Sequence, residues 1–261
     1  MTGKTESQTA PREESPPPPK DERPNAPANF PPSSAQERTN KTLPIDDLVA
    51  PVIARIKQKA KQHQPCEERK WLEWERRRAR DQILRRANLP PKHRAALVQW
   101  TPATDWTRAF DALKSKLGLG SQCALLGPRG TGKTQLAVEL AKVDAEALRS
   151  VRYCSLFEFF LAVKESYHGD DGGLSEARII AQFAAPSLLI LDEAQERGES
   201  AWEDHLITYL IDKRYRHEKD TLLISNLVEQ HFRDTFRDSI ISRVEETGGF
   251  IHCTWKSFRL E

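Results

Sequence analysis

A glycine-rich segment at residues 127–134 constrains the fold of this 261-residue chain more than any other part of its sequence. It reads GPRGTGKT, follows the apolar run Gln122–Leu126 and precedes a helical pattern. In this setting the glycines let backbone N–H groups turn toward phosphate oxygens, Lys133 reaches the β and γ phosphates, and Thr134 offers a hydroxyl to Mg²⁺. The alternative is a strand-to-helix turn without a ligand. We expect a phosphate site that comprises Gly127, Pro128, Arg129, Gly130, Thr131, Gly132, Lys133 and Thr134.

Two carboxylates, Asp192 and Glu193, follow the apolar run Ser187–Leu191. If that run is a strand beside the glycine-rich loop, Asp192 can hold Mg²⁺ through water. Glu193 can then orient and deprotonate the water that attacks the γ-phosphate. An Asp-Glu pair after an apolar run is also a common helix start, so this prediction depends on the pairing with Lys133.

A polar amide, Asn226, follows another apolar run, Thr221–Ser225. If this strand lies between the two preceding ones, Asn226 projects toward the γ-phosphate and the attacking water. Turns after strands also favour asparagine without any catalytic role.

Two arginines near the end of the chain, Arg243 and Arg259, are candidates for neutralising charge on the transferring phosphoryl group. Such a group supplied by a neighbouring subunit would make hydrolysis depend on assembly. The alternative for each arginine is an ordinary surface salt bridge.

Short apolar runs alternate with helical patterns beyond residue 118. This alternation predicts an α/β fold with a parallel sheet covered on both faces. The expected strands are Gln122–Leu126, Val151–Ser155, Ser187–Leu191, Thr221–Ser225 and Phe250–Thr254.

The N-terminal third differs in composition from the rest. Residues 1–44 hold ten of the seventeen prolines and predict a disordered tail, either a spacer or a ligand for a proline-binding groove. Residues 45–87 predict helices, the second of them over Glu67–Ala87 with Trp71 and Trp74 among many arginines. This second helix is either a solvated helix or a surface for a partner protein or nucleic acid.

Net charge also divides the chain, since residues 45–100 carry +7 and residues 101–261 carry −5. We therefore expect any contact with nucleic acid to be local. No stretch has the roughly 18 uncharged apolar residues of a membrane span, and the first residues lack a secretory pattern, so we expect a cytoplasmic protein. The cysteines, Cys66, Cys123, Cys154 and Cys253, are too scattered for a zinc site or a disulfide framework.

The motifs together resemble the helicase-loader and transposition-ATPase branch of the AAA+ family, with its DnaC-type loaders and IstB-type ATPases. The likeness lies in the loop GPRGTGKT, the strands LLILDE and LLISN, the segment HCTWKSFR after SRV, and the linker RRANLPPKHR. It covers about residues 80–261. It implies a five-stranded P-loop AAA+ sheet in the order 5-1-4-3-2, without a separate C-terminal lid domain.

The resemblance also implies roles for individual residues. Lys133 and Thr134 would be the Walker A pair, Asp192 and Glu193 the Walker B pair, with Thr134 and Asp192 at the metal. Asn226 would be sensor 1, Arg243 a finger acting on a neighbouring subunit, and Arg259 the sensor 2 arginine. The insert Leu156–Phe183 looks like the helical motif that touches single-stranded DNA, with Lys164 and Arg178 as its candidate phosphate contacts.

This sequence departs from the family pattern in the segment before the core, and the departure bears on the identity of the partner protein that this segment binds. Some relatives carry a cysteine-pair metal site before the core, whereas this chain has only Cys66 there. The expected organisation is a tail at 1–44, a helical partner-docking segment at 45–87 and an AAA+ ATPase domain at 88–261.

The function expected from this resemblance is loading of a replicative helicase onto single-stranded DNA. ATP and Mg²⁺ would be the cofactors, and the chain would self-associate through its ATPase interface. The first alternative is a transposition ATPase that binds DNA and recruits a transposase. The second is a nucleotide-gated binding switch with little turnover.

Overall fold

The computed structural model describes residues 54, 67–98, 101, 104–167, 175–198 and 200–258. The expected tail at 1–44, most of the first expected helix, Cys66 and Arg259 lie outside these residues. The elements follow in the order α2 (Glu67–Arg86), α3 (Pro91–Ala95), α4 (Asp105–Lys114), β1 (Gln122–Leu126), α5 (Lys133–Glu146), β2 (Val151–Ser155), α6 (Leu156–Glu165), α7 (Glu176–Ala184), β3 (Leu188–Asp192), α8 (Ala201–Arg216), β4 (Asp220–Ser225), α9 (Glu229–Thr235), α10 (Asp238–Thr247) and β5 (Gly249–His252).

A five-stranded parallel sheet in the order β2-β3-β4-β1-β5 forms the centre of the fold. Read from its other edge, this is the expected order 5-1-4-3-2, so the predicted fold is confirmed. The strands end at different residues from the apolar runs, because backbone pairing decides where a strand ends. Asp192 pairs with Ser155 and so belongs to β3, while β5 ends at His252, whose pairing partner is the last residue of β1.

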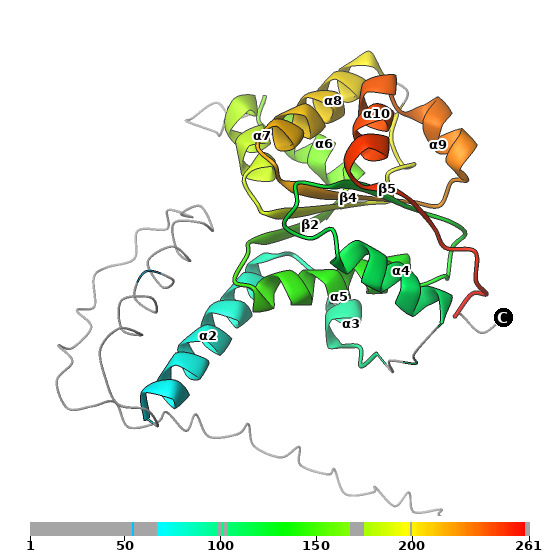
Figure 1. Cartoon of the computed structure of the whole chain (residues 1–261). Helices are drawn as coiled ribbons and strands as arrows, with labels where there is room; N and C mark the ends of the chain where they lie inside the picture. The colour runs from blue at the N-terminus through cyan, green and yellow to red at the C-terminus, as the bar shows by residue number, and fades with distance from the viewer. Residues whose placement is uncertain are drawn as a thin grey trace, which may run out of the picture. The chain divides into compact units, whose positions relative to one another are not determined.

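Helices cover both faces of the sheet, as Figure 1 shows. On one face α2, α4 and α5 enclose an apolar core with Ile83, Phe110 and Leu136. On the other face α6 to α10 enclose a second core around Phe159 and Phe232. The three central strands, β1, β3 and β4, are buried on both sides, which is the pattern of a parallel sheet between two helical layers.

The C-terminal half of α2 packs on the same body. Ala79 and Ile83 are buried, and Arg80 Nη1 lies 2.6 Å from Glu146 Oε1 at the end of α5. The N–H of Tyr153 donates to the carbonyl of Ala87, just after α2, over 2.7 Å. The first part of α2 extends away from the sheet (Figure 1). The expected domain boundary at residue 88 stays a prediction.

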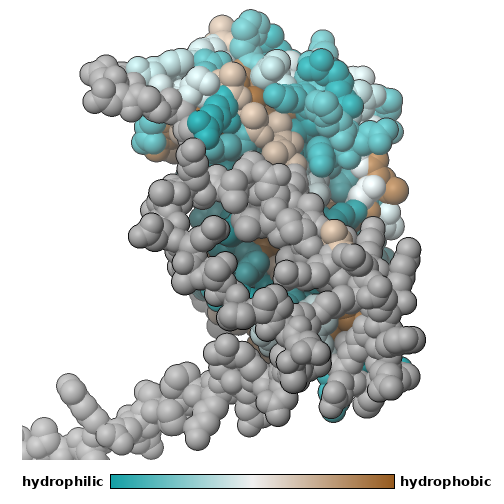
Figure 2. Space-filling view, turned by 90° about the vertical axis from the view of Figure 1, so that its left-hand side faces the viewer, coloured by the Kyte–Doolittle hydropathy of each residue, from teal (hydrophilic) through white to brown (hydrophobic). Residues whose placement is uncertain are grey.

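The surface of the upper helical layer is mostly hydrophilic in Figure 2, with a narrow strip of weakly apolar colour. Among the described helices, none combines the length and apolarity needed to cross a membrane. Cys123, Cys154 and Cys253 are buried free thiols.

One buried cation connects several elements on the α8 side of the sheet. Arg214 at the end of α8 is fully buried, and its guanidinium donates to the last two carbonyls of α7, those of Phe183 and Ala184, and to the carbonyl of Pro186 in the turn before β3. It also donates to Thr221 Oγ1 and to the carbonyl of Asp220 in β4. Burial lowers the pKa of Arg214 to about 9, which leaves the guanidinium protonated at neutral pH.

Replacing Arg214 by methionine should lower the free energy of unfolding by about 3–5 kcal/mol, because buried carbonyls lose their donors. The measurement is denaturant unfolding followed by circular dichroism. Arg216→Met is the matched control, since Arg216 is exposed and donates only within its own helix. Equal unfolding midpoints for the two variants would contradict this role of Arg214.

Candidate active site

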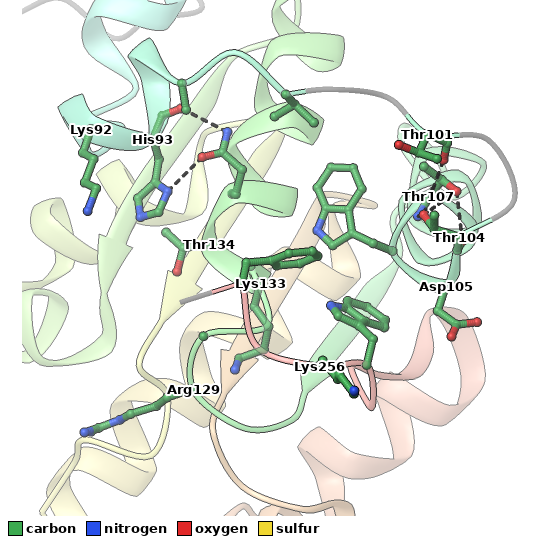
Figure 3. Close-up of a pocket in the computed structure, with 18 of the residues that line it drawn as sticks. Lys92, His93, Thr101, Thr104, Asp105, Thr107, Arg129, Lys133, Thr134 and Lys256 are labelled. Atoms are coloured by element: carbon green, nitrogen blue, oxygen red, sulfur yellow. Dashed lines mark hydrogen bonds between the residues drawn. The ribbon is translucent and has the colours of Figure 1, made fainter. Parts of the chain in front are cut away.

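The expected site residues of the glycine-rich loop and of the ends of β3 and β4 gather where parallel strands end. The carboxyl ends of β1, β3 and β4 lie at one edge of the sheet, and a pocket of about 1300 Å³ opens there. Its walls come from α3, the connection from α3 to α4, the loop after β1, the ends of β3 and β4, and the segment after β5. Figure 3 shows Lys133 and Thr134 side by side at the start of α5, with Arg129 pointing away from them.

The loop after β1 curls around the side chain of Lys133. The Lys133 ammonium donates to the carbonyls of Gly127 over 2.6 Å and Pro128 over 2.8 Å. Gly132 has φ +77°, and a Cβ atom there would lie 3.2 Å from the ring of Phe258. The left-handed backbone and this close approach explain why glycine occupies the position before Lys133.

A carboxylate faces the start of α5. Thr134 Oγ1 donates to Asp192 Oδ2 over 2.7 Å, and the hydroxyl of Tyr153 on β2 donates to the same oxygen over 2.7 Å. The N–H of Glu193 donates to Asp192 Oδ1 over 2.8 Å. Asp192 is buried, and burial raises the pKa of Tyr153, which keeps its hydroxyl a donor. The carboxylate orientation is therefore fixed by three donors.

Glu193 follows β3 in a left-handed conformation, with φ +53°. Such a conformation is unfavourable for a residue with a side chain, and it occurs often at functional sites. The side chain is exposed and lines the pocket. Although the side chain is exposed, the pocket wall partly desolvates its carboxylate. This desolvation raises the pKa of Glu193, with smaller contributions from Glu196 and Asp192, and makes the carboxylate a stronger proton acceptor.

The turn after β3 is bound to the end of β4. The N–H of Ala194 donates to the carbonyl of Ile224 over 2.8 Å. Gln195 Oε1 accepts from the N–H of Asn226 over 3.0 Å and from Ser225 Oγ over 3.1 Å. Asn226 lines the pocket, so the expected neighbourhood of Asn226 and Glu193 is present.

The segment after β5 covers the glycine-rich loop. The N–H of Cys253 donates to the carbonyl of Leu126, Trp255 Nε1 to that of Thr131 over 2.8 Å, and the N–H of Phe258 to that of Gly130 over 2.8 Å. The last two of these bonds satisfy carbonyls of the glycine-rich loop and hold the segment after β5 against it.

A short helix forms the opposite wall. His93 Nδ1 on α3 lies 2.9 Å from Gln135 Oε1 on α5, and Gln135 Nε2 donates to the carbonyl of His93 over 3.1 Å. Figure 3 shows this paired contact. It fixes α3 beside the start of α5, next to Val98 and Trp106 in the pocket wall.

Arg243 does not line the pocket of its own chain. On α10 its Nη2 lies 2.8 Å from Asp212 Oδ1, its Nη1 donates to the carbonyl of Ser239, and its guanidinium lies 5.2 Å from the Tyr215 ring centre. An action on phosphate would therefore have to be on a neighbouring copy.

The insert forms α6 and α7, as expected, with residues 168–174 between them outside the described residues. Phe159, Phe160 and Val163 bury one side of α6. The candidate DNA contacts, Lys164 and Arg178, are both exposed. Their role stays a prediction.

The structure adds residues that the sequence reasoning had not assigned to the site, namely His93, Gln135, Tyr153, Gln195, Trp255 and Phe258. One signal was available for Tyr153. Alternation along β2 places it on the same face as Ser155, which pairs with Asp192. The others come from long-range contacts that no local pattern encodes.

The residues present suit a nucleoside triphosphate with Mg²⁺. The loop offers an ammonium and N–H groups for phosphates, and Thr134 and Asp192 offer the oxygen ligands that Mg²⁺ prefers. Within the described part of the chain, no cluster of three or more His, Cys, Asp or Glu side chains could hold a metal. Magnesium would therefore need phosphate oxygens in addition to the protein.

Comparison with known proteins agrees with this geometry. A family model described as "IstB-like ATP binding protein" matches residues 66–245. The replicative helicase loader DnaC of Buchnera aphidicola subsp. Baizongia pistaciae is 25% identical over 135 residues, which are 51% of this chain and 54% of the loader. The chain thus spans about half the length of this curated relative.

Two solved structures share the fold. The DnaC helicase loader superposes with a TM-score of 0.53 at 17% identity, over 62% of this chain and 99% of that one. The replication initiator DnaA bound to AMPPCP and single-stranded DNA gives a TM-score of 0.53 at 22% identity, over 65% of this chain and 52% of that one. Since the family model covers more than half of the chain, the protein belongs to the IstB-like ATP binding proteins, as an AAA+ protein of the DnaC/IstB type.

Proposed function

We propose that this protein is an ATP-dependent loader that places a replicative helicase on single-stranded DNA and hydrolyses ATP at the interfaces between its own copies. The observation that carries the proposal is the convergence of Lys133, Thr134, Asp192 and Glu193 at one sheet edge. The similarity to relatives named as helicase loaders supports helicase loading as the proposed function.

In this proposal the chain supplies phosphate binding, metal ligands and a base. The Lys133 ammonium leaves the loop carbonyls for the β and γ phosphates, and Thr134 turns its hydroxyl oxygen toward the metal. Bound Mg²⁺ neutralises charge on the phosphates. Glu193 accepts a proton from the attacking water, and Asn226 orients that water.

The adenine ring of ATP would find a suitable binding surface on the α3 side of the pocket. Val98 and Trp106 provide apolar surface, and the contact between His93 and Gln135 keeps α3 at a fixed distance from the phosphate loop. Packing of the adenine ring against these apolar side chains is favourable.

Hydrolysis between copies requires a second chain. Arg243 lies on α10 outside its own pocket, held by Asp212, and we assign it to the γ-phosphate of a neighbour. Arg259, outside the described residues, remains the proposed sensor 2 arginine. Self-association then couples ATP turnover to assembly.

Helicase docking is assigned to residues 45–87. Within the described part of this segment, Arg76, Arg77 and Arg78 are exposed near the middle of α2. A basic helix of this kind suits an acidic protein surface. DNA is assigned to the insert, where exposed Lys164 and Arg178 can contact phosphates.

The loading proposal is tested by affinity capture of the host's replicative helicase. We expect ATP-dependent capture that is lost when Arg76, Arg77 and Arg78 are changed to glutamate. Native mass measurement of the complex gives the copy number. No binding with or without ATP would contradict helicase loading.

A transposition ATPase is the second candidate, because the matching family model is IstB-like. It would coat DNA and recruit a transposase through the same ATPase fold. Capture of a transposase encoded beside this gene, in place of a helicase, would favour this candidate.

Lys133→Ala should weaken ATP binding at least about tenfold, because the phosphates lose their charged donor. Isothermal titration calorimetry measures the affinity. Lys142→Ala is the matched control, since Lys142 lies on the same helix and pairs with Glu139 over 2.8 Å. Unchanged affinity in the Lys133 variant would contradict the assignment of the phosphate loop.

Glu193→Gln should retain ATP binding and lower steady-state turnover by about 10²–10⁴, the usual contribution of a general base. Release of phosphate is measured with DNA and helicase present. The control is Glu196→Gln, a nearby exposed carboxylate. If the parent protein hardly turns over and Glu193→Gln changes nothing, the nucleotide-gated switch replaces the hydrolase.

Arg243→Ala should spare ATP binding and reduce turnover by about 10³–10⁵, the range of a finger supplied by a neighbour. Mixing this variant with Lys133→Ala provides the control. In mixed assemblies, a copy of the Arg243 variant keeps an intact ATP pocket, and a neighbouring copy of the Lys133 variant supplies Arg243 to it. Part of the ATPase activity should therefore return. Full ATPase activity of Arg243→Ala alone would exclude a role of Arg243 at the γ-phosphate of a neighbouring copy.

A further inference from the structure

Two hydroxyls reach one oxygen of the site carboxylate. Asp192 Oδ2 accepts from Thr134 over 2.7 Å and from Tyr153 over 2.7 Å, while Oδ1 accepts from the N–H of Glu193. The proposed function gives Thr134 a role at the metal and Glu193 a role at the water. It gives Tyr153 none.

The backbone of Tyr153 is held on both sides of its strand. Tyr153 pairs with Ile190 of β3, two residues before Asp192 and on the same face of the sheet. On the outer edge of β2 its N–H donates to the carbonyl of Ala87 over 2.7 Å, and Asn88 Nδ2 donates to its carbonyl over 3.4 Å. The hydroxyl therefore extends to Asp192 from a fixed position.

Thr134 has a second task beside its bond to Asp192. Its hydroxyl proton goes to Asp192, and a lone pair of the same oxygen would ligate Mg²⁺ when the metal binds. The Tyr153 hydroxyl comes from the β2 side and bonds Oδ2 independently of Thr134. Of the side-chain donors to Asp192 within the described part of the chain, Tyr153 alone has no second task in the proposed function.

We propose that Tyr153 is a positioning residue that orients Asp192 for Mg²⁺ when MgATP binds. The inference rests on the proposed function and adds to it the group that keeps the metal-side carboxylate in place. Hydrogen bonds to ligating groups from the surrounding residues contribute about 10–100-fold to metal affinity. Loss of the Tyr153 hydroxyl should therefore appear in the metal dependence of nucleotide binding.

The test is Tyr153→Phe, which removes one oxygen and keeps the ring. Binding of a fluorescent ATP analogue is measured over a series of Mg²⁺ concentrations and in EDTA. The Mg²⁺ concentration for half-maximal binding should rise about 10–100-fold, whereas affinity in EDTA should change less than about twofold. Binding of Mn²⁺ in the presence of ATP, followed by electron paramagnetic resonance, should weaken by the same factor.

Tyr167→Phe is the matched control, because its hydroxyl also donates to a carboxylate, that of Glu176, in the insert away from the pocket. It should leave the Mg²⁺ curve unchanged. In an Asp192→Asn background, Tyr153→Phe should add little further effect, since the tyrosine acts through Asp192. Tyr153→Leu, which also lacks the donor, should displace the curve in the same direction and serves if the Phe variant does not fold.

The outcomes separate the two claims. A parental Mg²⁺ curve for Tyr153→Phe overturns the positioning role and leaves the proposed function intact. Equal loss of binding with and without Mg²⁺ also overturns it, because a purely structural role predicts that result. If the parent protein binds no ATP under any condition, the proposed function fails, and this inference fails with it.

Discussion

The hydrogen bond from Thr134 to Asp192 joins the two halves of the site, and the rest of the arrangement depends on it. The two residues are 58 positions apart in the chain. They meet because α5 begins just after the carboxyl end of β1, and only β4 separates β1 from β3, which ends in Asp192. Parallel pairing then puts the carboxyl ends of these strands at one edge, where ligands bind in open α/β sheets.

Three separate segments make hydrogen bonds at this edge of the sheet. The turn after β3 is tied to the end of β4 through Gln195, the segment after β5 is tied to the glycine-rich loop through Trp255, and β2 reaches the carboxylate through Tyr153. A ligand that moves the loop would disturb the contact of Trp255, and one that moves the carboxylate would disturb that of Tyr153. The left-handed backbone at Glu193 places some strain at the same point.

Much of this could be predicted from local sequence. The glycine loop, Lys133 and the acids after β3 form short motifs whose chemistry depends on near neighbours, and the alternation of apolar runs with helices predicts the sheet. The contacts of Trp255 and of His93 with Gln135 could not be predicted so, because they join residues 124 and 42 positions apart. The C-terminal half of α2 also packs on the body, although its arginine-rich sequence suggested a separate surface.

Strand ends were the other difference, and the reason is physical. Asp192 continues the pairing of β3 with β2 although it is charged, since its side chain finds hydroxyl donors there. At β5, pairing ends at His252, and the chain then leaves the sheet to bind the phosphate loop. Hydropathy alone marks neither point.

A structure of the assembled protein with Mg²⁺ and a nonhydrolysable ATP analogue tests the account most directly. We expect the triphosphate to lie in the loop at residues 127–134, with the metal between Thr134 and Asp192 and with Arg243 of an adjacent copy facing the γ-phosphate. A nucleotide bound elsewhere, or none at all, would contradict a triphosphate site shared between copies.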